Sequence, residues 1–292
     1  MNKFDSFHAN FIDILKKRGK ATATVIAYSK DIEQLLSHVE NLGKEVITEV
    51  KKEDLEHFLE TLRNTNYTPK SISRKINATR TFFKYLIDEK IIAEDPAQLI
   101  THPKLDPKKP RILSKVEYRA LRDTAKSDPR SAAMIETLLQ TGVRISELAN
   151  IRVSDITFGE DSKLGKLHVP QVETKEERTI PLNSVVQKAM KDYLEVRPKS
   201  KKDYLFITKT GNPLLIRNIR ATIDRLFRLA GVEQAKVNDL RHTFVVHHLR
   251  MGVNITHLSK IAGHKRLSTT EKYLEFVEQR SENSEKLELL EL

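Results

Sequence analysis

A cluster of prolines between two helical segments most constrains how this chain can fold. Four prolines stand within 96–110, at Pro96, Pro103, Pro107 and Pro110. Proline lacks a backbone donor and disfavours helix in the residue before it, so this stretch is expected to be an extended connector. The 292-residue chain is long enough to bury a core on each side. We therefore expect domains over 1–100 and 113–280, a linker over 101–112 and a C-terminal tail over 281–292.

Residues 1–100 are expected to form a helical domain. Apolar residues recur at helical spacing in stretches that begin near Phe7, Ile26 and Leu55. A fourth helix is expected to open at Thr68-Pro69, because an N-cap residue is followed there by proline at the first helical position. Its basic residues would either follow a DNA backbone or form a solvated face. They are Lys70, Arg74, Lys75 and Arg80.

Residues 113–280 are expected to be mainly α-helical with a small antiparallel sheet. The segment 114–117 has the S-x-x-E form of a capping box, which predicts the start of a helix. Alternating residues over 166–170 and 178–182 predict a hairpin, and 204–207 is expected to add a third strand. Helical spacing predicts further helices, with Ser268 as the N-cap of the last one. Their expected ranges are 217–230, 240–251, 255–262 and 268–277.

Composition narrows the classes of function. The chain has 51 Lys and Arg against 40 Asp and Glu, and its net charge of +11 favours nucleic acid or an acidic membrane surface as a partner. A solvated, lysine-rich surface would give the same charge. Because there is no cysteine, disulfides, thiolate zinc sites and a cysteine nucleophile are excluded. No apolar run approaches the roughly 20 residues that cross a bilayer and no signal peptide is recognisable, so we expect a cytoplasmic protein without a membrane partner.

Four polar residues in the second half of the chain fit chemistry on a phosphodiester. They are Arg144, Arg241, His264 and Tyr273. Arginine binds phosphate oxygens through two parallel hydrogen bonds and keeps its charge, and a phenol can attack phosphorus. No metal is implied, because the arginines already neutralise charge. Each residue alone would more often be a surface ion pair, a helix cap or packing, so the inference depends on their joint order.

The segments 141–148, 238–244 and 263–273 resemble the signature boxes of the tyrosine recombinases, which include phage and transposon integrases and chromosome-dimer resolvases. The layout is similar to that of the Xer-type site-specific recombinases, and the resemblance covers nearly the whole chain. It implies a helical, SAM-like N-terminal DNA-binding domain and a mostly helical catalytic domain. It also implies cleavage and rejoining of double-stranded DNA at a specific site through a 3′-phosphotyrosyl intermediate. No cofactor is implied, and the implied assembly is a tetramer on two duplexes.

The resemblance also implies a role for each matching residue. Arg144 and Arg241 would hold the non-bridging oxygens of the scissile phosphate, with Glu147 orienting Arg144. Tyr273 would be the nucleophile, and ionising a phenol with a pKa near 10 costs about 4 kcal/mol at neutral pH. His264 would be the hydrogen-bond partner or general base of this tyrosine, and the arginines would favour its phenolate form.

Two positions depart from the family's pattern. Its commoner form would place the lysine that protonates the leaving 5′-oxygen at position 173, which is glutamate here. Lys175 is the only lysine of that turn and is the expected acid, with Lys166 as the alternative. Asn238 replaces the usual histidine three residues before the second arginine, and its amide can bind phosphate but cannot exchange a proton near neutral pH. His242, directly after that arginine, is expected to face elsewhere on the helix.

Two other functions stay open at this point. A type IB topoisomerase would use the same chemistry as a monomer, and a catalytically weak relative would bind DNA only to regulate a site. Tyr273 argues against pure binding, whereas Asn238 favours it. The tail over 281–292, with leucines among glutamates, would dock on a neighbouring protomer or pack on its own domain. The target site, any accessory protein, and the choice among dimer resolution in chromosome segregation, integration, excision and inversion do not follow from the sequence.

Overall fold

The computed structural model describes residues 4–105, 109–160, 164–172 and 176–278. Contacts divide the chain into an N-terminal unit, Met1–Lys108, and a C-terminal unit, Lys109–Leu292. Lys175 and the tail over 281–292 lie outside the described residues. Within these residues, no helix combines the length and the apolar character that a membrane span requires.

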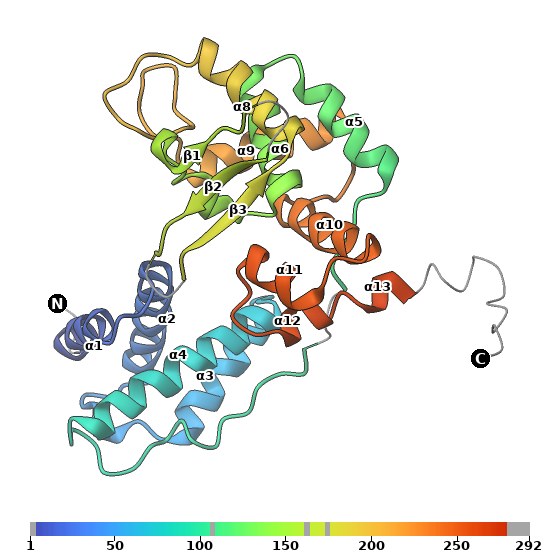
Figure 1. Ribbon diagram of the computed structural model, residues 1–292. Helices are drawn as coiled ribbons and strands as arrows, with labels where there is room; N and C mark the ends of the chain where they lie inside the picture. The colour runs from blue at the N-terminus through green and yellow to red at the C-terminus, as the bar shows by residue number, and fades with distance from the viewer. Residues whose placement is uncertain (1–3, 106–108, 161–163, 173–175, 279–292) are drawn as a thin grey trace, which may run out of the picture. The chain divides into compact units, whose positions relative to one another are not determined.

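The N-terminal unit is a set of helices (Figure 1), and they share a hydrophobic core of aliphatic and aromatic side chains. Its last helix, α4 (Pro69–Asp88), begins as expected, because the Thr68 hydroxyl accepts a hydrogen bond from the backbone N–H of Ser71 at 3.2 Å. Phe11 and Phe82 meet edge to face in the core with 5.2 Å between ring centroids. The helices are α1 (Asp5–Lys17), α2 (Thr22–Asn41), α3 (Lys52–Asn64) and α4 (Pro69–Asp88), with a 3-10 turn at Ile47–Glu49.

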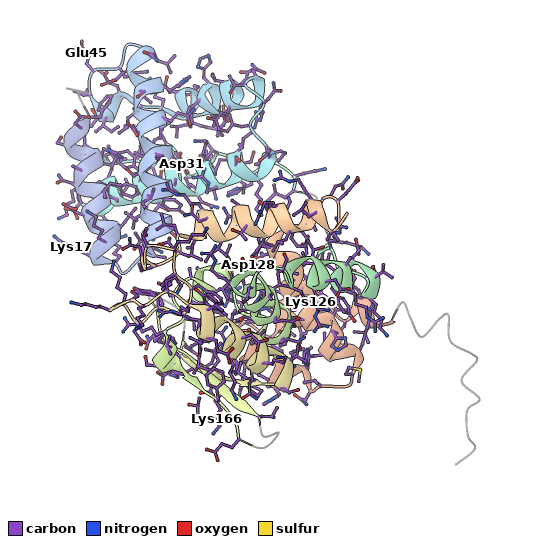
Figure 2. The ribbon with its side chains drawn as sticks, turned by 90° about the horizontal axis from the view of Figure 1, so that it is seen from above. Lys17, Asp31, Glu45, Lys126, Asp128 and Lys166 are labelled. Atoms are coloured by element: carbon purple, nitrogen blue, oxygen red, sulfur yellow. The ribbon has the colours of Figure 1, made fainter. Side chains whose placement is uncertain are left out.

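The C-terminal unit is mostly helical. Its first helix has the expected capping box, since the Ser114 hydroxyl accepts from the backbone N–H of Glu117 and the Glu117 carboxylate accepts from that of Ser114. Asp128, labelled in Figure 2, caps the next helix through the N–H of Ser131. The helices are α5 (Lys115–Ala125), α6 (Pro129–Thr141), α7 (Ile145–Leu148), α8 (Ser184–Val196), α9 (Ile216–Leu229), α10 (Val237–Arg250), α11 (Ile255–Ala262), α12 (Ser268–Glu271) and α13 (Glu275–Glu278), with a 3-10 turn at Val153–Asp155.

A three-stranded antiparallel sheet of order β1-β2-β3 lies in this unit, formed by β1 (Ile156–Thr157), β2 (Gly165–Val169) and β3 (Arg178–Leu182). The expected hairpin is confirmed, with Lys166 opposite Pro181. The expectation of a strand at 204–207 is wrong, because this segment makes only isolated bridges while Leu205 and Phe206 are buried in the core. The third strand, β1, is too short for its alternation to be recognised in the sequence.

The helix expected over 268–277 is interrupted. It forms two short helices, α12 and α13, and Tyr273 lies in the turn between them. The N–H groups of Tyr273 and Phe276 bond to carbonyls three residues earlier, at 3.0 and 3.1 Å, so the chain turns tightly here. Ser268 lies inside α12 rather than capping it, and Leu267 at the N-cap makes no side-chain cap bond. The direction of the Tyr273 side chain is therefore set by this turn and not by a continuous helix.

Candidate active site

Two glycines that end helices bring the arginines together. Gly142 ends α6 with φ of +62° and Gly263 ends α11 with φ of +66°, a left-handed conformation that glycine adopts without strain. Arg241 of α10 donates to the carbonyls of Gly142 and Ala262, both at 2.5 Å. Arg144, at the N-cap of α7, donates to the carbonyl of Gly263 at 2.6 Å. Chain segments 119 residues apart thus meet at one point.

A buried carboxylate lies between two of the site's arginines. Glu147 accepts from Nη1 of Arg144 at 3.0 Å, the contact expected from the sequence. It also accepts from both terminal nitrogens of Arg178, at 3.2 and 2.8 Å. Burial alone would raise the pKa of Glu147, but the hydrogen bonds and charges of Arg178 and Arg144 lower it to about 2. The carboxylate therefore stays ionised and holds both guanidinium groups.

Arg178 is the residue of this cluster that sequence reasoning missed. It opens β3, and its Nε donates to the carbonyl of Ile261 at 2.8 Å. A Cβ at position 263 would lie 2.9 Å from Cζ of this arginine, so glycine there also makes room for the guanidinium. The signal was present in the alternation of the strand. Arg178 shares a face with Ile180 and Leu182, which are both buried, and an arginine on the inward face of a strand needs a buried partner.

The hydroxyl of Tyr273 meets a histidine other than the expected one. Tyr273 is buried, and its hydroxyl oxygen lies 2.7 Å from Nδ1 of His242. The ring of His264 lies parallel to the tyrosine ring, 6.2 Å away, and its Nδ1 is 2.8 Å from the hydroxyl of Thr270. The expectation that His242 faces elsewhere is thus wrong. Consecutive helical positions point about 100° apart, so Arg241 reaches the glycine carbonyls while His242 faces the turn that carries Tyr273.

Burial has the largest effect on the pKa values of three side chains of the site. Burial and the charges of Arg241 and Arg144 lower the pKa of His264 to about 4, so its ring is neutral at neutral pH. Burial, followed by the charge of Arg144, lowers the pKa of Arg241 to about 10, which still leaves it charged. Burial raises the pKa of Tyr273 despite the two arginines, which oppose it. The two arginines therefore favour the phenolate, as expected, but in this state burial has the larger effect. The site is cationic around a neutral phenol.

The other polar positions expected from the sequence are not among the contacts described above. Asn238 is exposed in the first turn of α10. Lys166, labelled in Figure 2, is exposed on β2, the central strand of the sheet. The expected acid, Lys175, lies outside the described residues. Over the ranges that the structure describes, no group of His, Asp or Glu side chains is arranged to hold a metal ion.

The basic residues singled out in α4 do not form one solvated face. Lys75 is buried, and its Nζ donates to Asp31 at 2.8 Å and to Gln34 at 2.6 Å. Arg74 is exposed but also pairs with Asp31, which Figure 2 labels. Arg80 donates to a backbone carbonyl, that of Ile100, at 2.5 Å. The expectation of a basic face is therefore wrong for Lys75, whose charge is neutralised in the interior. DNA contacts by the exposed Lys70 and Arg74 stay a prediction.

Comparison with family models matches both parts of the chain. Residues 111–280 match the phage integrase family, and residues 9–90 match the N-terminal SAM-like domain of phage integrases. The chain is 30% identical to the tyrosine recombinase XerC of Bacillus subtilis (strain 168), over 94% of this chain and 92% of the relative. It is 32% identical to a tyrosine recombinase of Pseudothermotoga lettingae, over 92% of this chain and 93% of the relative.

Solved structures of recombinases are also similar over most of this chain. The XerA recombinase is 25% identical with a TM-score of 0.55, covering 97% of this chain and 99% of that structure. The XerH site-specific recombinase, bound to a palindromic difH substrate in a post-cleavage complex, has a TM-score of 0.76 at 18% identity. That match covers 94% of this chain and 83% of the XerH structure. The similarity to XerH shows a shared fold, which consists of a SAM-like helical domain and a mainly helical domain with a small sheet.

Proposed function

This chain belongs to the phage integrase family of tyrosine recombinases, and we propose that it cleaves and rejoins double-stranded DNA at a specific site through a 3′-phosphotyrosyl intermediate. One observation carries the proposal. Arg144 and Arg241 converge on the loop over 262–264, and the charges of both act on Tyr273. Two fixed cations can hold a phosphodiester, and the buried phenol beside them can attack its phosphorus.

In the proposed reaction the arginines bind the scissile phosphate. Each guanidinium has five N–H donors, and the contacts to the Gly142, Ala262 and Gly263 carbonyls and to Glu147 leave others for phosphate oxygens. The same contacts hold the planes of the guanidinium groups before DNA arrives, so little reorganisation is needed as negative charge builds on the phosphate. Arg144 and Arg241 would thus stabilise the transition state more than the resting phosphodiester.

His264 is suited to bind the phosphate in this reaction. With the Thr270 hydroxyl donating to its Nδ1, neutral His264 carries its proton on Nε2, which can donate to a phosphate oxygen. The ring stays neutral down to about pH 4, so this donor does not change over the neutral range. Asn238 would add an amide donor from the first turn of α10.

The leaving 5′-oxygen needs a proton as its bond to phosphorus breaks. Lys175 in the hairpin turn is our first choice for this acid, and Lys166 on β2 is the alternative. Exchange of Lys175 for methionine should slow cleavage of ordinary DNA. It should have little effect on a substrate with sulfur in place of the 5′-bridging oxygen, since a thiolate leaves without a proton.

The test is a search for a covalent protein–DNA adduct that survives SDS, carried out in EDTA. Genomic fragments that bind the Tyr273→Phe variant would be selected first, nicked near the bound site, and incubated with wild type and variant side by side. An adduct with wild type alone supports the proposed tyrosine chemistry. An adduct with both proteins would overturn the choice of Tyr273.

Two further outcomes separate the rival functions. Bound DNA that gives no adduct with wild type would favour a regulator that does not cut, with Asn238 as the first suspect. Relaxation of a supercoiled plasmid that lacks the selected site would favour a topoisomerase. For the recombinase we expect four protomers on two duplexes, with the tail over 281–292 docked on a neighbour. The mass of the trapped complex, with and without the tail, measures this.

A further inference from the structure

Within the described residues, His242 is the side chain whose nitrogen lies within hydrogen-bond distance of the Tyr273 hydroxyl. The separation is 2.7 Å, and the planes of the two rings are tilted by 40°. Both groups lie largely out of solvent. We propose that His242 is the general base that removes the Tyr273 proton during DNA cleavage. This inference rests on the proposed function and adds a catalytic residue to it.

Other candidates for this base fit the geometry less well. His264 uses its Nδ1 on Thr270 and lies with its ring parallel to the tyrosine ring, so it does not approach the hydroxyl edge-on. Asn238 is exposed, and an amide does not accept a proton near neutral pH. Glu147 is held by Arg144 and Arg178. His242 thus supplies a titratable nitrogen at the position where the nucleophile loses its proton.

The proton balance of the step follows from this contact. With the proton of neutral His242 on Nε2, the phenol O–H donates to Nδ1. As the tyrosine oxygen forms its bond to phosphorus, the O–H bond breaks and the proton moves to Nδ1, which makes His242 cationic. The bond from phosphorus to the 5′-oxygen breaks, and that oxygen takes a proton from a separate acid. In rejoining, the 5′-hydroxyl attacks phosphorus and gives its proton back to the conjugate base of that acid. The bond from phosphorus to the tyrosine oxygen breaks, and His242 returns its proton to that oxygen.

Burial lowers the pKa of His242 and so favours its unprotonated form before reaction. On its own helix, Asp239 raises its pKa and Arg241 lowers it, while burial lowers it further and is the largest effect. From other segments, Tyr273 lies at Nδ1, and His264 is close enough to interact with it electrostatically. A base that is neutral at working pH can accept a proton. The scissile phosphate, once bound, would add negative charge nearby and favour the cationic product.

The test measures the single-turnover rate of adduct formation against pH on the nicked substrate. His242→Asn retains an amide oxygen near the position of Nδ1 but cannot take a proton. We expect this variant to be slower by about 10²- to 10⁴-fold, the usual contribution of a general base. We also expect it to lose the acid limb of the wild-type profile, which reflects protonation of His242. His248→Asn is the matched control, because His248 is half-buried on the same helix and its Nδ1 lies 2.9 Å from the carbonyl oxygen of Phe244.

A second arm separates a base from a side chain that only positions the phenol. Incorporating 3,5-difluorotyrosine at position 273 makes the phenol more acidic, so the need for a base falls. If His242 is the base, the rate gap between wild type and His242→Asn narrows with this nucleophile. A constant gap and an unchanged pH profile would overturn the inference and leave a positioning role.

The controls keep this test distinct from that of the function itself. No adduct with wild type would mean that the proposed function fails. If wild type forms the adduct and the rate of His242→Asn lies within about threefold of the wild-type rate, His242 is not the general base, whereas the proposed function stands. Circular dichroism and DNA binding verify that each variant folds. If His242→Asn does not fold, His242→Gln replaces it in the same rate and pH measurements. A slower rate without the acid limb then supports the base, and a rate near that of wild type rules it out.

Discussion

At the scale of single residues, one buried carboxylate holds together a site that is otherwise cationic. Arg144, Arg178 and Arg241 lie close enough for each of the other two to lower the pKa of Arg241. Glu147 offsets part of this repulsion through ion pairs at 3.0 and 2.8 Å. Three guanidinium groups against one carboxylate leave excess positive charge where the phosphate is expected. This charge favours DNA binding and makes the arginine cluster depend on Glu147.

The pKa of Glu147 predicts a specific acid sensitivity. The carboxyl has a pKa of about 2 in the folded protein, against 4.5 for an unperturbed glutamate. A lowered pKa stabilises the fold above about pH 4.5, and this contribution is lost as pH falls towards 2. Between pH 5 and 2, wild type should lose about 3 kcal/mol more unfolding free energy than Glu147→Gln. Urea unfolding across this range measures the difference, and parallel curves for the two proteins would contradict it.

Arg178 provides a second prediction at this scale. Arg178→Met leaves half of the hydrogen bonds of Glu147 unmade in a buried setting, so we expect a loss of about 3–5 kcal/mol in unfolding free energy. Arg178→Lys should recover only part of it, because an ammonium cannot form two parallel bonds to a carboxylate. The double variant Arg178→Met with Glu147→Gln should be more stable than Arg178→Met alone. If its loss equals the sum of the single losses, the two residues are not coupled.

At the scale of elements, short helices with left-handed glycine ends build the site. α6 and α11 each stop at a glycine, and each leaves a carbonyl for an arginine from a different element. The tight turn between α12 and α13 then presents Tyr273 to α10. Continuous helix through 263 or 273 would use these backbone groups internally. The interruptions are therefore what allow the backbone to orient the reactive side chains.

Exchange of a helix-ending glycine tests this view. Gly263→Ala faces two costs, a left-handed backbone of roughly 1–2 kcal/mol and a Cβ 2.9 Å from the Arg178 guanidinium. Gly252→Ala is the matched control, because its φ is +79° but nothing lies within 4 Å of an added Cβ. Both variants should be destabilised, and only Gly263→Ala should also lose adduct formation by tenfold or more. Equal activity in the two variants would mean that the contact with Arg178 is not needed.

At the scale of the whole molecule, each unit has hydrophobic clusters of its own. The N-terminal cluster is built around Phe11 and Phe82. The C-terminal unit has one cluster that includes Leu167 and Phe206, and a second that includes Tyr273. Since each unit buries its apolar side chains against its own helices, each meets the main requirement for folding alone.

The N-terminal unit should therefore fold when it is made alone. Residues 1–105 should show a helical circular dichroism spectrum and a single cooperative urea transition. Phe82→Ala should lower the unfolding free energy by about 3–5 kcal/mol, because the ring is fully buried and the cavity would collapse only in part. The more conservative Phe82→Leu should cost less. A non-cooperative transition for the unmodified fragment would show that its core is insufficient.

The sequence by itself determined the features that depend on neighbouring residues. The N-caps at Thr68 and Ser114, the pairing of 166–170 with 178–182, and the helix over 255–262 follow from spacing and local hydrogen bonds. The chemical types needed for phosphate chemistry could also be recognised, because arginine and tyrosine carry that chemistry wherever they lie.

Only the tertiary structure decided which of these side chains touch. The partner of Tyr273 is His242, 31 residues away, and the carbonyl that orients Arg144 belongs to Gly263, 119 residues away. The burial of Lys75 against Asp31 and of Arg178 against Glu147 likewise depends on how separate elements pack. Helical or strand periodicity specifies a face of an element but not what covers that face. Contacts between distant segments follow from packing and burial, which no local pattern encodes.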